Sequence, residues 1–595
     1  MIKSRTLKHL EPLKGEFSLR SRQSRWRRLA RQPEDYDLLI VGGGIVGAGL
    51  AYEASSQGLK VALVEKGDFA SGTSSKSSKL LHGGLRYLEQ YEFGLVFEAL
   101  SARNELFDKF PHLVSKVPFL MPVYKRYEER AWFINLGCWL YDVFSWTSSP
   151  FHTIRHRWVD RHRLKEMEPH IERQDFEGGL NFYDAACDDA RLTLETLKTA
   201  QRLGADLFNY AAVVDFVKDE NQQVTAAVIQ DQLDHSSPLT LNVKRVINAT
   251  GPWADHLNRL ANPDEPSYLR PSKGVHLVIP RVTHKERAIM LKTVPDSSGK
   301  QRWMFVIPYQ EYSIIGTTDT DYEGDTRSDY LDHDNYASPE DVRYLLASVN
   351  AIFPEACLTP DDVVSSYGGW RPLVAPPGKS IHESDISRSH EIFETTTGIT
   401  MLAGGKLTTY LYMAQDLLKH LHKQDPKHFG KVRPSQEPPL CNRLQAHSVE
   451  ELRERLDPVL ARVPDSWHAR LIQRYGAEVI SLMKLEPYFE GSLEPVPGLS
   501  EEIAMLGIEI AYSVIYEQAL HLNDILLRRQ RILLRDRNQG QKAARPIALQ
   551  MAEVFCLLLG WTAAEKQAWV EAEVTAFTAE LARTNAWKQA PETAA

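Results

Sequence analysis

Three glycines and one acid near the N-terminus have the types and the spacing that bind a dinucleotide. Residues 38–51 read LLIVGGGIVGAGLA, an apolar run that breaks at glycines and resumes with small side chains. Gly42 permits a tight turn, Gly44 lets the backbone approach a pyrophosphate, and Gly47 lets a helix pack on a strand. A second apolar run, KVALVE, ends in Glu65, which can accept hydrogen bonds from a pair of ribose hydroxyls. The pattern predicts a strand, a turn and a helix whose N-terminus faces phosphate groups.

The segment INATGPWA, residues 247–254, narrows the choice of dinucleotide. An apolar strand that ends at Gly251 brings backbone close to a bound ligand, because only glycine is expected to avoid a clash there. Together with the glycine turn and Glu65, this strand indicates a flavoprotein in which FAD lies extended across a sheet. The sequence shows one nucleotide-binding turn, which argues against an NAD-dependent enzyme.

A hydroxyl-rich segment, SGTSSKSSKLLHGGLRY, begins at Ser71. Its consecutive hydroxyls and two glycines can wrap the phosphates and the ribityl chain of the cofactor, and a flexible serine loop is the alternative. The candidate cofactor contacts in this segment are Thr73, Ser74, Ser75 and Ser78.

A second glycine pair, in GGKLTTY, precedes a predicted helix start. The N-terminus of that helix and Lys406 can stabilise negative charge on the pyrimidine ring of a reduced flavin. Gly405 and Thr408 are the accompanying cofactor contacts. A helix cap with a solvated lysine is the alternative.

Cationic side chains stand near these turns. They are Arg86, His276, Arg371 and Arg388. Taken singly, each is more often a surface charge or a satisfied core group. In one pocket they would form a site for a phosphate, which arginine recognises through two parallel hydrogen bonds.

The elements that must position these residues are those of an α/β protein. Alternating runs in residues 205–250 predict a meander inserted into a parallel sheet, and KGVHLVIP, RWMFVIPY and EYSIIGTTDT predict an antiparallel sheet. We expect an FAD domain of the two-dinucleotide-binding type, interleaved with an antiparallel-sheet substrate domain, and an all-α C-terminal domain. The predicted bounds are 35–115, 181–254 and 366–428 for the FAD domain, 116–180 and 255–365 for the substrate domain, and 430–595 for the C-terminal domain.

The composition is that of a globular protein with two or three domains. Of the 595 residues, 43% are hydrophobic and 25% are charged, and the formal net charge of −8 argues against a nucleic-acid-binding protein. The five cysteines are scattered without a CxxC pair, so neither a disulfide framework nor a metal site is expected. No apolar run is long enough to predict a membrane-spanning helix.

Residues 1–34 form a strongly basic start. A flexible, solvated arm is the first interpretation, and contact with anionic lipid or with a partner is the second. Its cations are Lys3, Arg5, Lys8, Lys14, Arg20, Arg22, Arg25, Arg27, Arg28 and Arg31, against Glu11 and Glu16.

Taken together, the motifs resemble the FAD-dependent glycerol-3-phosphate dehydrogenases, a family within the D-amino-acid-oxidase-like flavoproteins. The resemblance is carried over residues 36–415 by VGGGIVGAG, TSSKSSKLLHGGLRYLEQYEFGLVFEAL, NATGPW, SIIGTTDTDYEGD, GWRPL and GGKLTTY. It continues more loosely into the helical tail, in DILLRRQRILL and MAEVFCLLLGWTAAEKQAWVEAEV.

The resemblance implies oxidation of sn-glycerol 3-phosphate to dihydroxyacetone phosphate, with hydride transfer from C2 to flavin N5 and electrons passed to a membrane quinone. By motif match, the substrate-pocket positions are Arg86, Tyr87, Arg371, Arg388 and Lys406. His276 also falls there and is the side chain best suited to take the C2 hydroxyl proton near neutral pH. Lys406 or a water is the alternative base. The candidate catalytic residues are therefore His276, Arg371 and Lys406.

Two other functions remain open: an oxygen-reducing glycerol-3-phosphate oxidase that makes hydrogen peroxide, and a non-catalytic FAD-binding scaffold or sensor. Quinone reduction without a spanning helix needs peripheral contact with the bilayer. KRYEERAWFINLGCWLYDVFSW, residues 125–146, has the aromatic residues and flanking cations of an interfacial helix, although core packing explains it equally well. The expected location is cytoplasmic, on the inner face of the cell membrane, and a homodimer is left open.

Overall fold

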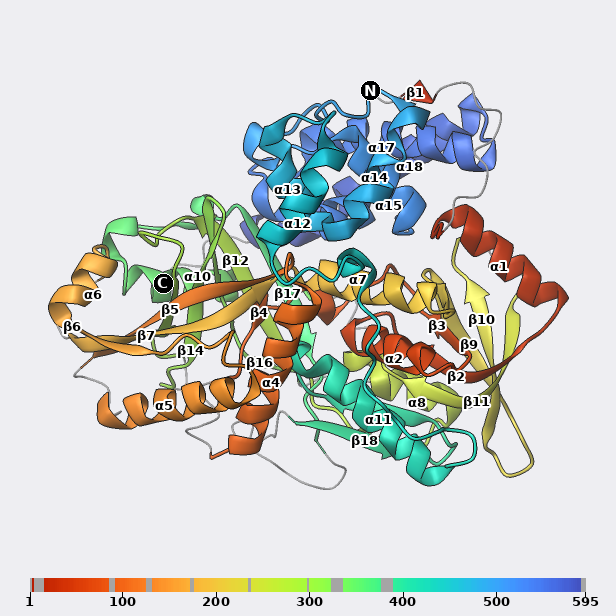
Figure 1. Ribbon diagram of the computed structural model, residues 1–595, viewed down its shortest axis with the longest axis horizontal. Coiled ribbons are helices and arrows are strands. Elements are labelled where there is room, and N and C mark those ends of the chain that lie inside the picture. The colour runs from red at the N-terminus through yellow and green to blue at the C-terminus, as the bar shows by residue number, and fades with distance from the viewer. Residues whose placement is uncertain are drawn as a thin grey trace.

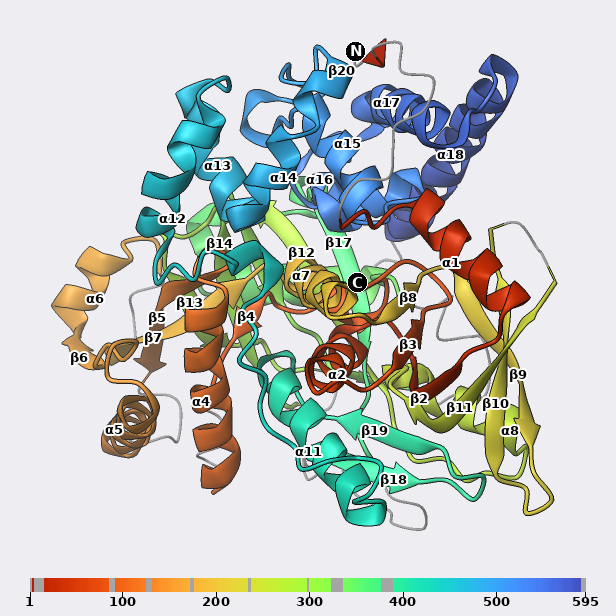
Figure 2. The same cartoon turned by 45° about the vertical axis from the view of Figure 1, so that its right-hand side comes forward.

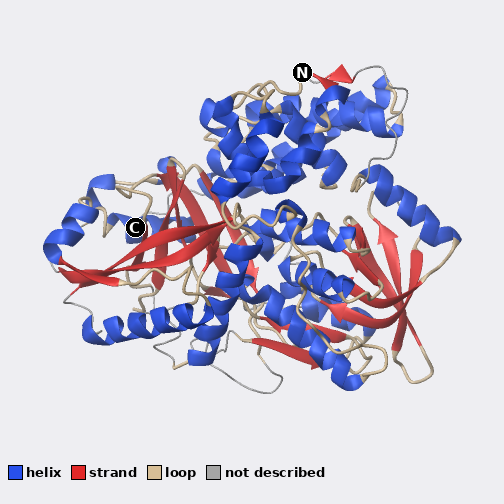
Figure 3. Cartoon of the chain, in the orientation of Figure 1, coloured by secondary structure: helices blue, strands red, loops and turns tan. Residues whose placement is uncertain are grey.

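The computed structural model describes residues 3–4, 15–84, 91–124, 131–171, 176–233, 237–296, 299–322, 335–375 and 389–589. A mainly parallel sheet, a mainly antiparallel sheet and a helical domain make up this part of the chain. In Figure 1 the helical domain lies above both sheets. Figure 3 shows that strands are concentrated in the two lower regions, whereas the upper region is almost entirely helical.

The first sheet carries the glycine turn. Its strands run in the order β18 (His390–Glu394), β19 (Thr400–Gly404), β11 (Leu239–Asn248), β2 (Asp35–Val41), β3 (Val61–Val64) and β8 (Asp206–Phe208). From β19 to β8 all neighbours are parallel, while β18 is antiparallel to β19. Two further strands, β9 (Ala211–Lys218) and β10 (Val224–Asp231), join β11 in an antiparallel meander. This arrangement confirms the meander predicted for residues 205–250.

Helices cover both faces of the first sheet, which is why its strands are apolar on both sides. One face packs against α2 (Ile45–Ser56), α7 (Asp189–Arg202) and α11 (Tyr410–Gln424). Leu38 and Ile40 of β2 point toward these helices, and Leu39 points to the opposite face, where α1 (Leu19–Arg31) and α8 (Ala254–Ala261) pack. Successive side chains of a strand point to opposite faces, so β2 contributes side chains to the hydrophobic cores on both faces of the sheet.

Helix α1 differs from the flexible arm predicted for the basic start. Ser18 caps the helix, and Trp26 and Leu29 are buried against the first sheet. Arg22 is fully buried, and its guanidinium makes an ion pair with Asp231 at 2.8 Å. The prediction of a solvated arm is therefore wrong for α1, because the spacing of Arg22, Trp26 and Leu29 puts them on one buried face of the helix.

The second sheet is mainly antiparallel. Its strands run in the order β16 (Thr320–Asp321), β12 (Ser272–Pro280), β15 (Tyr312–Gly316), β14 (Trp303–Tyr309), β13 (Ala288–Lys292), β5 (Val114–Tyr124), β7 (Phe176–Cys187) and β4 (Leu80–Leu81). β17 (Ser365–Arg371) also pairs with β12, and β6 (Arg157–Asp160) pairs with β7. The structure thus moves residues 80–81, 114–115, 181–187 and 366–371 from the predicted FAD domain to this sheet, because they continue its hydrogen-bonded ladders.

Helices flank the second sheet. On one face α10 (Pro339–Asn350) and α6 (Arg161–Met167) pack against β12 and its neighbours. On the other face α5 (Ala131–Ser148) contributes Cys138 to a core with Phe119 and Phe182. Helix α4 (Phe93–Lys109) packs against α5 through Leu100 and Tyr141. In Figures 1 and 2, α5 lies below the second sheet, on the side away from the helical domain.

The C-terminal domain has its own hydrophobic core, drawn from residues 446–581. Its α-helices are α12 (Val449–Leu456), α13 (Asp465–Tyr475), α14 (Val479–Met483), α15 (Gly507–Tyr516), α16 (Ile532–Arg535), α17 (Gln541–Leu559) and α18 (Ala563–Thr584). A two-residue strand near the N-terminus, β1 (Lys3–Ser4), pairs with β20 (Phe489–Glu490) of this domain. Among the helices that the structure describes, none combines the length and the apolar character needed to cross a membrane.

Candidate active site

The glycine turn joins β2 to α2. Gly42 has φ +114°, a conformation that residues with side chains rarely adopt, and a Cβ there would lie 2.6 Å from the Ala249 carbonyl oxygen. A Cβ on Gly47 would overlap the carbonyl oxygen of Gly42. Gly44 is the N-cap of α2 and would place a Cβ 3.0 Å from Ser74 Oγ. The three glycines therefore let β2, the end of β11 and α2 meet without intervening side chains.

Glu65 follows β3 and turns back onto the glycine turn. Its carboxylate accepts hydrogen bonds from the backbone N–H of Gly43 at 2.7 Å and of Gly67 at 2.8 Å. Burial raises the pKa of the Glu65 carboxyl group. The carboxylate lies beside the turn, and its contact with a ribose remains a prediction.

Residues 73–79, which we call the serine loop, run from the first sheet toward the second. The loop begins with the 3-10 helix η1 (Thr73–Ser75). Ser74 Oγ accepts a hydrogen bond of 2.8 Å from the N–H of Ile45, at the N-terminus of α2. Thr73 Oγ1 donates at 2.6 Å to the carbonyl oxygen of Trp370, in β17. The serine loop thus connects the glycine turn with the strand that carries Arg371.

Gly251 lies just after β11, at the start of a short 3-10 helix. Apart from its own chain neighbours, no described atom lies within 4 Å of the position where its Cβ would be, and the clash expected from the sequence, which is with a bound ligand, stays a prediction. Its φ of +60° also favours glycine, because residues with side chains rarely adopt this left-handed conformation. Gly251 therefore borders an open space, and this space lies close to the glycine turn.

His276 lies in β12 and is 3% exposed. Its Nε2 is 2.8 Å from Ser78 Oγ in the serine loop. The ring of Tyr367, from the neighbouring strand β17, stacks on the imidazole with 4.9 Å between ring centroids and 11° between planes. Nδ1 of His276 is buried and has no hydrogen-bond partner in the described part of the chain. The imidazole is therefore fixed in orientation while one nitrogen stays available.

The electrostatic surroundings of His276 keep it neutral. Burial lowers its pKa well below the usual value, and the positive charges of Lys79 and Arg371 lower it further. A neutral imidazole can accept a proton, as a general base must, and its lowered pKa at the same time makes it a weaker base than a free imidazole.

Arg371 ends β17 and is held on several sides. Its Nη1 donates to the Asp319 carboxylate at 2.7 Å and to Ser272 Oγ at 3.0 Å. Its Nη2 donates to Thr317 Oγ1 and to the carbonyl oxygen of Thr318, both at 3.0 Å. These bonds fix the plane of the guanidinium group. A phosphate at Arg371 would compete with Asp319 for its donors.

Lys406 lies between the end of β19 and the 3-10 helix η6 (Leu407–Thr409), which leads into α11. Its Nζ is buried and its charge acts on Glu98 of α4. The pKa of Glu98 is raised by burial, and nearby cations, Lys406 among them, oppose that rise. Lys406 thus lies within electrostatic range of α4.

Gly405 and Thr408, the proposed cofactor contacts near Lys406, each lie in tightly packed surroundings. Gly405 has φ +74°, and a Cβ there would overlap Met413 Sδ. Thr408 is buried at 3% exposure. Three other predicted substrate residues, Arg86, Tyr87 and Arg388, lie outside the described residues.

Three residues that shape this site were not singled out from the sequence. Asp319 stands inside the recognised motif SIIGTTDTDYEGD, and Tyr367 lies two residues before the recognised motif GWRPL, so closeness to these motifs was the available signal. Arg531, which reaches the serine loop from the C-terminal domain, donates to the carbonyl oxygen of Ser75 at 2.9 Å. No spacing rule links residues so far apart in the chain.

Three observations fit FAD at this site. The glycine turn brings backbone directly to the N-terminus of α2, where a pyrophosphate is favoured. Open space lies beside Gly251. A buried ring nitrogen of His276 lacks a partner among the described residues. The residues expected to hold FAD are those of the glycine turn, Glu65, the serine loop, Gly251, Gly405 and Thr408.

Comparison with known sequences identifies two regions. The family described as FAD dependent oxidoreductase matches residues 37–411, and the family described as C-terminal domain of alpha-glycerophosphate oxidase matches residues 399–566. These regions correspond to the two sheets and to most of the helical domain.

Whole-chain relatives agree with these matches. Glycerol-3-phosphate dehydrogenase 2 of Mycobacterium tuberculosis is 37% identical over 553 residues, which cover 91% of this chain and 87% of the relative. Aerobic glycerol-3-phosphate dehydrogenase of Staphylococcus aureus is 37% identical over 398 residues, with 67% and 69% covered. The crystal structure of the glycerol-3-phosphate dehydrogenase from Bacillus halodurans, complexed with FAD, superposes with a TM-score of 0.70 at 28% identity, covering 95% of this chain and 98% of that one.

The fold and the matched regions define an FAD-dependent oxidoreductase of the D-amino-acid-oxidase-like class, with FAD as its cofactor. Within that class, the family is identified by the helical C-terminal domain and by relatives that match most of the chain. The chain belongs to the FAD-dependent glycerol-3-phosphate dehydrogenase family. The predicted fold class, family and cofactor are thereby confirmed.

Proposed function

We propose that this protein oxidises sn-glycerol 3-phosphate to dihydroxyacetone phosphate. The observation that carries the proposal is the contact network that places His276, the serine loop and Arg371 at the junction of the two sheets. The names of its relatives, which are 37% identical to it, support the same substrate here.

The proposed chemistry needs a base, an anion site and a hydride acceptor. Bound FAD supplies the acceptor for the hydride from C2 of the substrate. His276 accepts the C2 hydroxyl proton on Nδ1, the nitrogen that Ser78 does not occupy. Stacking by Tyr367 holds the ring in place, and its lowered pKa keeps it neutral before the reaction.

The substrate phosphate is proposed to bind Arg371, with Arg86, Tyr87 and Arg388 as further ligands. Asp319 orients the guanidinium group of Arg371 and balances its charge while no anion is bound. Lys406 is proposed to stabilise the negative charge that develops near it during the reaction. Its buried Nζ is suited to this role, because charges interact more strongly away from water.

A membrane quinone is the proposed electron acceptor, reached by peripheral contact with the inner face of the cell membrane. Helix α5 and the turn after it expose large apolar side chains, which is unusual for a surface that faces only water. They are Leu136, Trp139, Trp146 and Phe151, the last 90% exposed. Tyr91, Phe93 and Phe97, at the start of the adjoining helix α4, extend the apolar surface.

Sedimentation with anionic vesicles tests this contact. The protein should pellet with vesicles, and replacement of Trp139 and Trp146 by serine should reduce the bound fraction several-fold. Replacing exposed Trp158, on strand β6, is the matched control. Full recovery of the unmodified protein in the supernatant would remove the membrane proposal.

The acceptor is tested separately. With sn-glycerol 3-phosphate present, a short-chain quinone should be reduced rapidly, and oxygen should be consumed slowly when no quinone is added. Rapid oxygen consumption with hydrogen peroxide production would instead support the oxidase alternative. A flavin that stays oxidised when substrate is added without oxygen would support a scaffold or sensor.

A further inference from the structure

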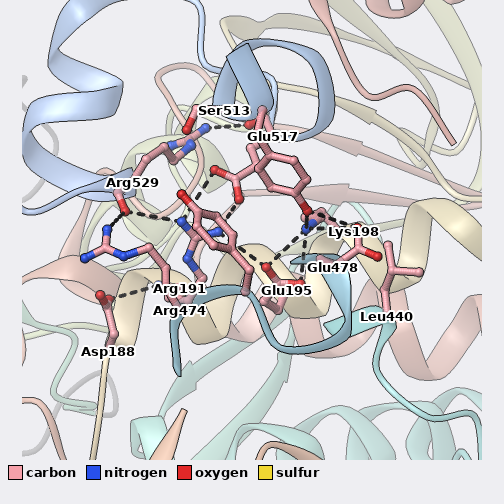
Figure 4. Close-up of polar contacts among 12 residues, drawn as sticks. Asp188, Arg191, Glu195, Lys198, Leu440, Arg474, Glu478, Ser513, Glu517 and Arg529 are labelled. Carbon is pink, nitrogen blue, oxygen red and sulfur yellow. Dashed lines mark hydrogen bonds and ion pairs between the residues drawn. The ribbon is translucent and has the colours of Figure 1, made fainter. Parts of the chain in front are cut away.

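A buried ionic network joins α7 of the first sheet to the C-terminal domain. Arg191 of α7 makes an ion pair with Glu517, and Lys198 donates to Tyr512 Oη at 2.8 Å. In Figure 4, Arg191 and Lys198 of α7 meet Glu517 and Glu478 of the C-terminal domain, with Arg474 and Arg529 beside them. Burying so many charges costs desolvation energy that ion pairs seldom return in full, so stability alone is a poor explanation for the network.

The end of this network nearest the active site is a short arginine-rich segment. We call Arg528, Arg529 and Arg531 the arginine turn; the first two end the π-helix η12 (Asp524–Arg529). Arg531 is 2% exposed and has φ +56°, the left-handed region that residues with side chains rarely adopt. The guanidinium of Arg531 is held by hydrogen bonds and ion pairs with Ser75, Asp188 and Asp189.

The arginine turn contacts the serine loop. Arg531 Nη1 donates to the carbonyl oxygen of Ser75 at 2.9 Å, and Nη2 makes ion pairs with Asp188 at 2.9 Å and with Asp189. Asp189 in turn accepts hydrogen bonds from the hydroxyl of Ser77 at 2.6 Å and from its N–H at 3.1 Å. Lys79 Nζ completes the arrangement, 3.3 Å from the same carboxylate.

The same turn holds the segment that follows Glu65. Arg528 Nε makes an ion pair with the buried carboxylate of Asp68 at 2.5 Å, and Arg529 makes another. Two residues further, the N–H of Ala70 donates to the carbonyl oxygen of Gly43 in the glycine turn at 3.0 Å. One segment of the C-terminal domain thus reaches both stretches of chain that are expected to contact FAD.

From the serine loop the contacts continue to the candidate base. Ser78, next to Ser77, bonds His276, and the hydroxyl of Tyr367 donates to the carbonyl oxygen of Ser77 at 3.1 Å while its ring stacks on His276. A displaced serine loop would therefore move both the expected cofactor contacts and the support of the imidazole.

We propose that the arginine turn is a positioning element of the flavin site, and that Arg531 acts through Asp189 and Ser77 to set the serine loop in its FAD-binding conformation. The C-terminal domain is then part of the flavin site rather than an appended module. The proposal rests on the placement of FAD given above and does not depend on the identity of the substrate.

The test is the dissociation constant of FAD, measured by titrating the full-length apoprotein at a temperature where every variant is folded. Arg531→Gln should raise this constant about 10-fold or more, the loss expected for hydrogen bonds to a charged group. Arg531→Lys keeps the charge but cannot reach Ser75 and both carboxylates together, so it should restore only part of the affinity.

Two further variants keep the test decisive. Ser77→Ala changes only the loop side of the contact and should weaken FAD binding about threefold even if the arginine variants fold poorly. Arg470→Gln, which removes an ion pair with Glu509 inside the C-terminal domain, should leave the constant within about twofold of the unmodified protein. FAD binding by Arg531→Gln and Ser77→Ala that matches Arg470→Gln would overturn the proposal.

The FAD titrations test the arginine turn independently of the test of the proposed reaction. If the unmodified protein binds FAD but sn-glycerol 3-phosphate does not reduce it, the proposed function fails while the FAD titrations still decide the role of the arginine turn.

Discussion

Ser78 Oγ lies 2.8 Å from Nε2 of His276, so the loop expected to hold FAD also supports the side chain expected to take a proton from the substrate. Ser78 lies in the serine loop, His276 lies in β12 of the second sheet, and the two residues are 198 positions apart in the chain. Cofactor binding and proton transfer therefore share one hydrogen bond, and a change in either residue should affect both.

Replacing His276 tests its role as base. His276→Gln should lower kcat by roughly 10²- to 10⁴-fold, the usual contribution of a general base, with a small change in KM. Because burial and nearby cations lower the pKa of His276, the acid limb of kcat/KM should lie below pH 6.5 in the unmodified enzyme. A variant that keeps most of its kcat would assign the proton transfer to Lys406 or to a water.

Arg371→Ala tests the phosphate site. The lost charged hydrogen bonds should raise KM by about 10- to 100-fold, corresponding to roughly 1.5–3 kcal/mol. Arg343→Ala, on the exposed side of α10, removes the same charge away from the site and serves as the control. An unchanged KM would exclude Arg371 from phosphate binding.

Gly47→Ala tests the close packing of the glycine turn. The added methyl group would overlap the carbonyl oxygen of Gly42, so α2 must move away from β2 and FAD affinity should fall at least 10-fold. Gly94→Ala adds the same methyl group in α4, where no described atom beyond the neighbouring helix backbone lies within 4 Å of the added carbon, and this variant should bind FAD normally. Equilibrium dialysis with FAD distinguishes the two. Equal affinities would show that the turn tolerates the side chain.

His112 should make the free energy of unfolding depend on pH in mildly acidic solution. It is buried beside the C-terminal domain, both its ring nitrogens lack hydrogen-bond partners in the described part of the chain, and burial lowers its pKa to about 3. Between about pH 6.5 and that value, the unfolded chain binds a proton here that the folded protein does not. The free energy of unfolding should therefore fall as pH falls through this window, by up to about 1.4 kcal/mol per pH unit from this residue.

Urea unfolding at several pH values measures this effect. His112→Phe should show a shallower loss of stability between pH 6.5 and pH 5 than the unmodified protein. Exposed His162, replaced by glutamine, is the control and should leave the slope unchanged. The same slope in all three proteins would mean that His112 gains a proton without unfolding.

Local pattern was enough to predict the glycine turn, the alternating strands and the helical tail, because each depends on residues close together in sequence. The helix formed by Leu19–Arg31 was missed because its many arginines were interpreted as solvated charges, whereas Arg22 pairs with Asp231 from a distant strand. The boundary of the second sheet was misplaced for a related reason, since residues 181–187 join it through cross-strand pairing.

In the site, motif membership pointed to His276 and Arg371, but their surroundings depend on long-range contacts. Asp319, which orients Arg371, and Arg531, which reaches the serine loop, are brought there only by the folded chain. No periodicity or spacing in the sequence encodes those distances.

The most direct test of the proposed function is the flavin absorbance near 450 nm when sn-glycerol 3-phosphate is added to the FAD-loaded protein without oxygen. The absorbance should bleach within seconds, and glycerol, which lacks the phosphate that Arg371 is proposed to bind, should cause little bleaching at the same concentration. A flavin spectrum that sn-glycerol 3-phosphate leaves unchanged would contradict the proposed reaction.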